Sequence, residues 1–249
     1  MTDGRRRPTP CDFAAINYPF ADGGRAGSRL LFDFSLALAC FHPDPPNRKV
    51  LDFACGAGWT SEWLNKLGYD VYGFDIDEAA IDSGRKRAGL DDRIDPTRLH
   101  FSIANGHRIE FPNETFGHIL CFDSLHHMAD YEKVLQEMYR VLCPGGRAIF
   151  VEPGSRHSQS PETIQFLQNH PKGEDWLEKD VNLREMYDLA NRVGFVDFKV
   201  KPFLLPTMVE FSFVDWYHIL DNPEGIQNYM RELRRFAWED RGVFFMTRA

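Results

Sequence analysis

One short segment constrains the fold of this chain more than any other. Residues 49–58 read Lys-Val-Leu-Asp-Phe-Ala-Cys-Gly-Ala-Gly, an apolar run with an acid that leads into a Gly-x-Gly turn. Residues 59–67 follow with the spacing of a helix, and residues 69–75 read as a second strand that ends in an acid. Glycines at such a turn let a ligand approach the backbone, and an acid ending the next strand can accept two hydrogen bonds from a ribose diol. The segment therefore predicts half of a nucleotide-binding α/β fold.

Strand and helix patterns continue to alternate up to residue 152. Strands are expected near residues 49–53, 70–74, 99–103, 117–122 and 147–152. The helix before the last of these carries one apolar stripe and is stopped by Pro144-Gly145-Gly146. Such alternation predicts a mostly parallel sheet with helices on both faces. Ligands of that architecture bind outside the carboxyl ends of the strands.

The flanking segments have other patterns. We expect a flexible N-terminal segment over residues 1–28, then a helix with apolar residues at three- and four-residue steps from 29 to 41. Residues 153–182 are polar and read as an inserted loop or short helices, followed by a helix over 183–192 and strands over 195–200 and 243–247. An aromatic segment spans 203–220, and a helix follows it. One domain is expected over residues 29–249, with a ligand-binding core at 48–152 and cap insertions at 153–182 and 203–240.

Charge and cysteine content exclude several classes of function. A formal net charge of -8 argues against a broad nucleic-acid-binding face. The five cysteines are odd in number and form no Cys-x-x-Cys pair, so neither a disulfide framework nor a zinc site is predicted. No stretch approaches the ~20 apolar residues of a membrane span, and the first residues lack an apolar signal core. We therefore expect a cytoplasmic protein, a monomer or homodimer, with no membrane span and no nucleic-acid partner.

Four motifs in order resemble those of the class I S-adenosylmethionine-dependent methyltransferases, in particular the group similar to ubiquinone-biosynthesis C-methyltransferases. They are Val50–Gly58, Gly73–Asp77, Ala104–Pro112 with Thr115-Phe116, and the pair Ser124–His127 and Val141–Gly146. The resemblance implies an α/β fold with a Rossmann-like, doubly wound, mostly parallel seven-stranded sheet. Helices cover both faces, the last strand is antiparallel, and helical N-terminal and inserted cap segments are added.

The resemblance also implies S-adenosyl-L-methionine as the cofactor. Gly56 and Gly58 would let the turn pass its methionine and ribose portion. Asp52 would orient the methionine ammonium, directly or through water. Asp75 would take the ribose hydroxyls, and Ile76 beside it would pack on the adenine.

The loop after the third strand departs from the family pattern. The family usually has an Asp there for the adenine amino group, whereas this chain has Asn105, whose amide oxygen can still accept that hydrogen bond. Gly106 would offer its N–H to the ring, and Ala54 and Asp123 complete the expected cofactor residues. A second departure is Gly117, where the family usually has Asp, and we interpret it as a structural change at a strand start.

Methyl transfer from a sulfonium requires the acceptor atom to be close and aligned. An oxygen or carbon acceptor often also needs a general base. Candidates are His127 at the exit of the fourth strand, Glu152 at the end of the fifth and His157 in the insertion, although the sequence favours packing or hydrogen bonding over the base role for His127. No His/Asp/Glu trio has metal-ligand spacing, so the sequence predicts a metal-independent enzyme.

The acceptor is the least constrained part of the prediction. The insertion from residue 152 to 180 is similar to that of methyltransferases found beside sugar-assembly enzymes, which favours a hydroxyl of a sugar or other small metabolite. The alternatives are C-methylation of a quinone-like or lipid acceptor, a non-catalytic cofactor-binding protein, and a protein or RNA methyltransferase. Nicotinamide binding is disfavoured because Ser61 stands where a Gly-x-Gly-x-x-Gly turn needs glycine or alanine.

Overall fold

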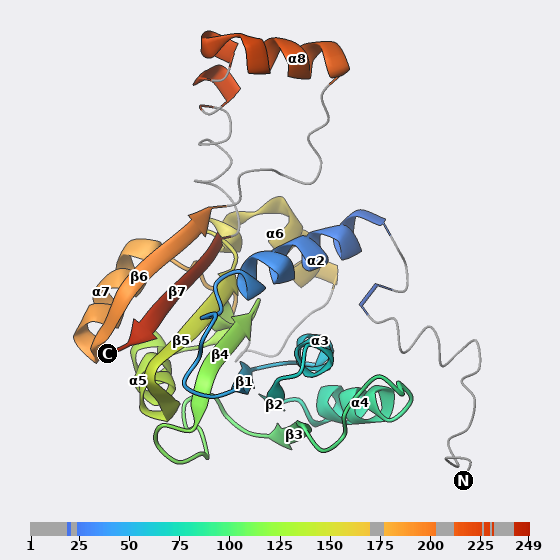
Figure 1. Ribbon diagram of the computed structural model, residues 1–249, viewed down its shortest axis with the longest axis vertical. Coiled ribbons are helices and arrows are strands. Elements are labelled where there is room, and N and C mark those ends of the chain that lie inside the picture. Colours follow the sequence, from blue (N-terminus) through green and yellow to red (C-terminus); the bar gives the residue numbers. More distant parts are fainter. Residues whose placement is uncertain are drawn as a thin grey trace.

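A single seven-stranded sheet organises the protein (Figure 1). The computed structural model describes residues 19–20, 24–169, 177–202, 212–225, 227–229, 231 and 242–249. The strands are β1 (Lys49–Phe53), β2 (Asp70–Asp75), β3 (Leu99–Ile103), β4 (Phe116–Phe122), β5 (Leu142–Glu152), β6 (Phe195–Pro202) and β7 (Gly242–Arg248). Their order across the sheet is β3-β2-β1-β4-β5-β7-β6.

The pairing confirms the fold that the sequence predicted. Strands β1 to β5 pair in parallel, and β7 is antiparallel to both β5 and β6. Because β1 lies between β2 and β4, the chain order reverses at β1 and the carboxyl ends of β1 and β4 meet at one edge. Ligands of doubly wound sheets bind at such a reversal.

Helices cover both faces of this sheet. They are α2 (Gly24–Leu38), α3 (Trp59–Lys66), α4 (Glu78–Ala88), α5 (Tyr131–Val141), α6 (Pro161–Asn169) and α7 (Leu183–Val193), with short 3-10 helices η1 (Leu125–His127) and η2 (His157–Gln159). Local signals fix their ends. Asp77 and Asn182 accept hydrogen bonds from the first turns of α4 and α7, and Gly194 ends α7 with φ 109°.

Alternation along the strands divides the core in two. Leu51 and Ile119 face one cluster, which also holds the apolar stripes of α5 and α7. Val50 and Leu120, one residue away, face a second cluster with side chains of α2 and α3. His118 of β4 is fully buried, and its ring lies 4.5 Å from that of Phe41. Burial lowers the pKa of His118 to about 4.

Two details differ from the sequence interpretation. Strand β5 begins at Leu142 and runs through the Pro-Gly-Gly stretch, where the sequence predicted a turn before a strand at 147. Its register with β4 shifts between Phe116 and His118, so the irregularity is absorbed inside the sheet. Gly117 lies at this shift, and a Cβ there would overlap the carbonyl of Asn47, whose side chain accepts the Gly117 N–H at 3.0 Å. The close approach to Asn47 therefore accounts for the glycine.

The aromatic segment is described only in part. Helix α8 (Phe213–Asp221) lies away from the sheet in Figure 1, and Phe213 and Tyr217 on it are exposed. The N-terminal residues 1–18 and residues 203–211 lie outside the described residues, and so do parts of the predicted helix after 221. Among the described helices, none combines the length and apolarity that crossing a membrane requires.

Candidate active site

The turn after β1 and the end of β2 form one polar corner. One oxygen of the Asp75 carboxylate accepts the N–H of Gly56 at 2.7 Å, and the other accepts the N–H of Asp77 at 2.9 Å. Gly56 has φ 54°, and a Cβ built on it would meet nothing within 4 Å, so the turn borders open space. A Cβ on Gly58 would overlap the ring of Phe101. Each carboxylate oxygen has two lone pairs, so Asp75 can brace the turn and still accept hydrogen bonds from a diol.

Asp52 lies behind this turn and is fully buried. One of its oxygens accepts hydrogen bonds from Thr60 at 2.6 Å and Ser61 at 2.5 Å, while Oδ1 has no hydrogen-bond partner among the described residues. Burial raises the pKa of Asp52 to about 6, although the two hydroxyls oppose that shift. A buried carboxylate oxygen of this kind fits a cationic donor, reached directly or through a water.

Two strained residues mark the ends of β1 and β4. Ala54 has φ 51° and Asp123 has φ 55°, backbone angles that residues other than glycine rarely adopt. The Ser124 hydroxyl donates to the Ala54 carbonyl at 2.9 Å and ties the two turns together. Such strain gathers at functional sites. Nothing in the sequence around these two residues predicts it.

The residues expected around the adenine follow β2 and β3. Ile76 is 72% exposed directly after β2. The Asn105 amide oxygen accepts the His107 N–H at 2.9 Å and also lies 3.1 Å from the His107 ring, so in this arrangement it holds its own loop. Gly106 is buried, and a Cβ on it would overlap the ring of Phe53. The adenine roles of Ile76, Asn105 and Gly106 stay predictions.

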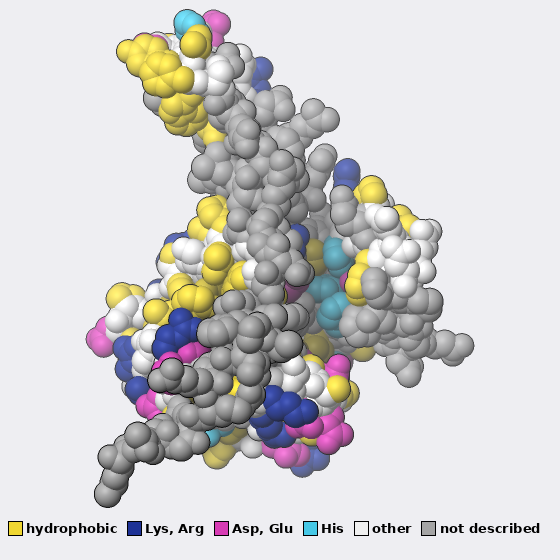
Figure 2. Space-filling view, turned by 90° about the vertical axis from the view of Figure 1, so that its right-hand side faces the viewer, with side chains coloured by type: hydrophobic (Ala, Val, Ile, Leu, Met, Phe, Trp, Pro, Cys, Tyr) yellow, Lys and Arg dark blue, Asp and Glu magenta, His cyan; other side chains and the backbone are white. Residues whose placement is uncertain are grey.

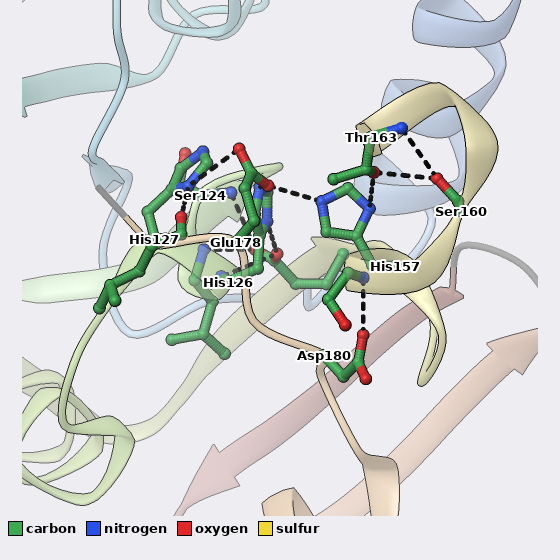
Figure 3. Close-up of polar contacts among 12 residues, drawn as sticks. Ser124, His126, His127, His157, Ser160, Thr163, Glu178 and Asp180 are labelled. Carbon is green, nitrogen blue, oxygen red and sulfur yellow. Dashed lines mark hydrogen bonds and ion pairs between the residues drawn. The ribbon is translucent and has the colours of Figure 1, made fainter. Parts of the chain in front are cut away.

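Three histidines and two glutamates meet at the carboxyl ends of β4 and β5 (Figure 3). We call His126, His127, His157, Glu152 and Glu178 the histidine cluster, of which Figure 3 labels the histidines and Glu178. His126 Nδ1 lies 2.8 Å from Glu152 Oε2, and His157 Nε2 lies 2.7 Å from Glu178 Oε2. The rings of His126 and His127 are 3.9 Å apart, and those of His126 and His157 are 4.8 Å apart. Figure 2 shows histidine side chains, in cyan, gathered in a recess of the surface.

The structure thus brings together the three residues that the sequence named as catalytic candidates, but these residues differ in how far they are exposed. Glu152 is 1% exposed, and its oxygens accept the N–H groups of Ser124 at 3.1 Å and Leu125 at 2.8 Å as well as the His126 ring. Through these hydrogen bonds Glu152 holds the 3-10 helix η1 in place. His127 and His157 are partly exposed. Glu178 was missed as a site residue, because it lies far from the histidines in sequence and no regular spacing connects it to them.

The pKa values of the two adjacent histidines, His126 and His127, are shifted in opposite directions. Burial acts to lower the pKa of His126, but the hydrogen bond and charge of Glu152 outweigh it and the pKa is raised. Burial and the neighbouring His126 lower the pKa of His127, whose Nδ1 lies 2.7 Å from the Leu177 carbonyl. A carbonyl only accepts, so Nδ1 of His127 carries a proton and Nε2 carries the lone pair.

Comparison with known proteins gives a consistent result. The profile of the family described as methyltransferase domain matches residues 51–150. Methyltransferase GfsG of Streptomyces halstedii is 32% identical over 233 residues, which cover 83% of this chain and 78% of that protein. A demethylmenaquinone methyltransferase of Bacillus mycoides is 26% identical over 183 residues, covering 64% of this chain and 74% of that protein.

A solved structure supports the fold. Phosphoethanolamine N-methyltransferase 2 of Haemonchus contortus, in complex with S-adenosyl-L-methionine, superposes with a TM-score of 0.65 at 18% identity. The match covers 95% of this chain but 57% of that chain. At this identity the likeness concerns the architecture of the sheet and its helices.

Proposed function

This chain belongs to the class I S-adenosylmethionine-dependent methyltransferases, and from that premise we propose that it methylates a hydroxyl group of a small-molecule acceptor. The acceptor would be a sugar or another hydroxylated metabolite. The observation that supports this choice is the histidine cluster at the carboxyl ends of β4 and β5, beside the turn that ends β1.

The cofactor would lie along the carboxyl ends of β1 and β2. Asp75 would accept the ribose hydroxyls, and the open side of Gly56 would admit the methionine portion. The unpartnered Oδ1 of Asp52 would receive the ammonium group, directly or through a water. These residues fit the cofactor because they supply an anionic, close-packed corner with an unsatisfied acceptor.

The acceptor would then enter from the side of β4 and β5. Its hydroxyl oxygen attacks the methyl carbon as the carbon–sulfur bond breaks, the electron pair stays on sulfur, and the hydroxyl proton is released. The products are a methyl ether, S-adenosylhomocysteine and a proton. His127 and His157 are polar, partly exposed and close enough together to orient a hydroxyl and receive its proton. Glu152 is a positioning residue that holds His126 and η1.

Methylation of a carbon is the second candidate. The relative in Bacillus mycoides is named a demethylmenaquinone methyltransferase, and exposed aromatic side chains on α8 could receive a quinone-like or lipid acceptor. The imidazole and carboxylate groups of the histidine cluster favour the hydroxyl, because a hydroxyl can form hydrogen bonds with them before it reacts.

The test is a screen of acceptors with an isotope-labelled methyl group on the cofactor. Sugars, other polyols, phenols and quinols are incubated with the full chain, and NMR of the product separates O-methyl from C-methyl carbons. Transfer to oxygen is the expected result. Label found on carbon alone would overturn the hydroxyl assignment and favour the second candidate.

The same preparation tests the cofactor corner. Asp75→Ala removes hydrogen bonds to a charged group, which typically costs roughly 1.5–3 kcal/mol, about tenfold to a hundredfold in affinity. Calorimetry with S-adenosylhomocysteine measures it, and Asp82→Ala, on the exposed surface of α4, is the matched control. Equal affinity of wild type and Asp75→Ala would remove Asp75 from the ribose site.

A further inference from the structure

We propose that His126, His127 and Glu178 bind a divalent transition-metal ion. One nitrogen of each histidine and one oxygen of Glu178 all lie within 4.8 Å of one another. Two imidazoles and one carboxylate form a donor set that suits borderline metals such as Zn²⁺ or Fe²⁺. Among the described residues, this is the group with a geometry that could hold such an ion.

One pair of donor atoms lies at nearly the spacing of a loaded site. Metal ions of this class bind imidazole nitrogen and carboxylate oxygen at about 2.0–2.2 Å, so neighbouring donors around one ion lie roughly 3–3.5 Å apart. His126 Nε2 lies 3.6 Å from Glu178 Oε2. This pair would need a contraction of a few tenths of an ångström, and the other donors, which lie within 4.8 Å of one another, would need a larger movement of their side chains. Side chains at the wall of a recess can supply that movement without a change of backbone.

His126 is already held in the tautomer that a metal needs. His126 Nδ1 bonds to the Glu152 carboxylate at 2.8 Å, and His127 Nδ1 donates to the Leu177 carbonyl at 2.7 Å. The contact with Glu152 keeps a proton on Nδ1 of His126 and leaves its Nε2 facing Glu178 at 3.6 Å. His127 lies nearest Glu178 through Nδ1, at 3.8 Å from Oε1, so its ring would have to turn in order to ligate. A carboxylate or carbonyl behind the imidazole is the usual outer support of a metal-bound histidine. Glu152 is itself fixed by the backbone N–H groups of Ser124 and Leu125, so the support is rigid.

His157 fixes the third ligand. Its Nε2 lies 2.7 Å from Glu178 Oε2, and its Nδ1 lies 3.2 Å from the Thr163 hydroxyl. The hydroxyl of Ser160 donates to that of Thr163 at 2.9 Å and completes the chain of contacts. Glu178 therefore reaches the histidines from a segment that is distant in sequence but held through η2 and α6. In the absence of a metal the same groups would form only a network of ion pairs, which is the competing interpretation.

The role of the ion rests on the proposed function, whereas its binding does not. With the ion bound, His127 is a ligand and does not receive the acceptor proton. An acceptor hydroxyl bound to the ion would instead lose its proton to solvent more readily, because a metal stabilises the alkoxide. The alkoxide oxygen then attacks the methyl carbon, and sulfur keeps the bonding pair. An acceptor with a second oxygen beside the hydroxyl, such as a diol or a hydroxyketone, would chelate the ion and be the preferred substrate class. This departs from the metal-independent enzyme that the sequence predicted.

The metal test uses the full chain alone, freed of any affinity tag and stripped with EDTA. Calorimetry with Zn²⁺ and the visible absorption of added Co²⁺ report binding without cofactor or acceptor. We expect one ion per chain, with Co²⁺ bands typical of nitrogen and oxygen ligands. His127→Gln and Glu178→Gln should weaken binding at least tenfold, and Glu152→Gln should weaken it roughly tenfold to a hundredfold through His126.

His100→Gln is the matched control, since His100 is an exposed histidine on β3 paired with Asp70. The proposal is overturned if wild type takes up no stoichiometric ion, or if both ligand variants bind like His100→Gln. The Co²⁺ spectrum of wild type keeps the test valid if a variant fails to fold. Methyl transfer with and without EDTA then tests the role: equal rates would refute hydroxyl activation by the ion while leaving the site. Absence of cofactor binding would refute the proposed function without touching the metal result.

Discussion

Two aspartates of similar position along neighbouring strands differ sharply as individual residues. Asp75 is partly exposed and bonded to backbone N–H groups, whereas Asp52 is sealed beneath the turn with two hydroxyl donors. The sealed carboxylate is the one whose pKa rises to about 6, because burial penalises its charge. If the ammonium group of the cofactor binds Asp52, cofactor binding must favour the ionised form of the Asp52 carboxyl group.

Cofactor affinity should therefore depend on pH through Asp52. In the free protein this carboxyl becomes protonated as the pH falls below about 6, and the ammonium must then displace a proton to bind. Affinity for S-adenosylhomocysteine should be constant near pH 7, where the ligand's ammonium group is charged, and fall by up to about tenfold for each pH unit below 6. Calorimetry across this range measures the slope. Asp52→Asn should bind more weakly and lose the slope, and a slope that persists in this variant would contradict the assignment.

At the scale of elements, helix α4 holds the Gly-x-Gly turn after β1 in place. Arg87 donates to the Ala57 carbonyl and, at 2.7 Å, to Glu62 of α3, so α4 clamps the turn against α3. A Cβ on Gly84 would lie 2.7 Å from the Ala57 carbonyl oxygen. The absence of a side chain at Gly84 thus lets the backbone of α4 approach the Ala57 carbonyl.

The substitution Gly84→Ala should push helix α4 away from the turn that follows β1. Helix propensity alone would favour alanine by ~1 kcal/mol, but overpacking against a backbone carbonyl typically costs roughly 1–3 kcal/mol and should dominate. We expect a melting temperature lower by a few degrees and weaker binding of S-adenosylhomocysteine. Ser83→Ala, one residue away on the exposed face of α4, should not lower either quantity. A variant as stable as Ser83→Ala, with unchanged affinity, would show that the turn tolerates displacement of α4.

Elements with a regular apolar pattern were predictable from the sequence, and irregular ones were not. Strands β1 to β4 and helix α7 lie within a residue or two of the predicted ranges, because apolar runs and stripes determine them. The start of β5 was misplaced, since the sheet tolerates a register shift across Pro144-Gly145-Gly146.

The site divides in the same way. His127, Glu152 and His157 were predictable because they follow strand ends, and strand ends converge at one edge of a parallel sheet. The contribution of Glu178 depends on how a long insertion folds back, which no periodicity encodes. The strained backbone of Ala54 and Asp123 was equally hidden, because neither residue is a glycine that would signal a positive φ.

For the molecule as a whole, a buried histidine at the centre of the sheet should make the folded state less stable in acid. His118 is buried in β4, and burial together with the charge of Arg147 lowers its pKa to about 4. The folded state therefore keeps this ring neutral, while the unfolded state takes up a proton near its ordinary pKa of about 6.5. Stability should fall as the pH drops from about 6.5 to about 4, and the effect of His118 should end below that.

The gap between the two pKa values corresponds to on the order of 3 kcal/mol of unfolding free energy. His118→Phe keeps an aromatic ring beside Phe41 and should reduce the loss of stability over this range. Urea unfolding at several pH values measures it, with His218→Asn on the exposed surface of α8 as the control. If both variants lose stability with acid as wild type does, another group is responsible.

The placement of β7 has a consequence for how the chain is made. A ribosome delivers β5 and then β6, but β5 has only β4 beside it and β6 lacks its partner strand until residues 242–248 emerge, because β7 lies between them. The half of the sheet from β1 to β4 can pair well before that moment, since N-terminal segments are free to fold first. Until synthesis reaches β7, the nascent chain holds open the edge of β5, whose last residues are all buried in the finished sheet. An open apolar edge is the feature that invites pairing with other chains, so this interval is when the growing polypeptide most needs a chaperone.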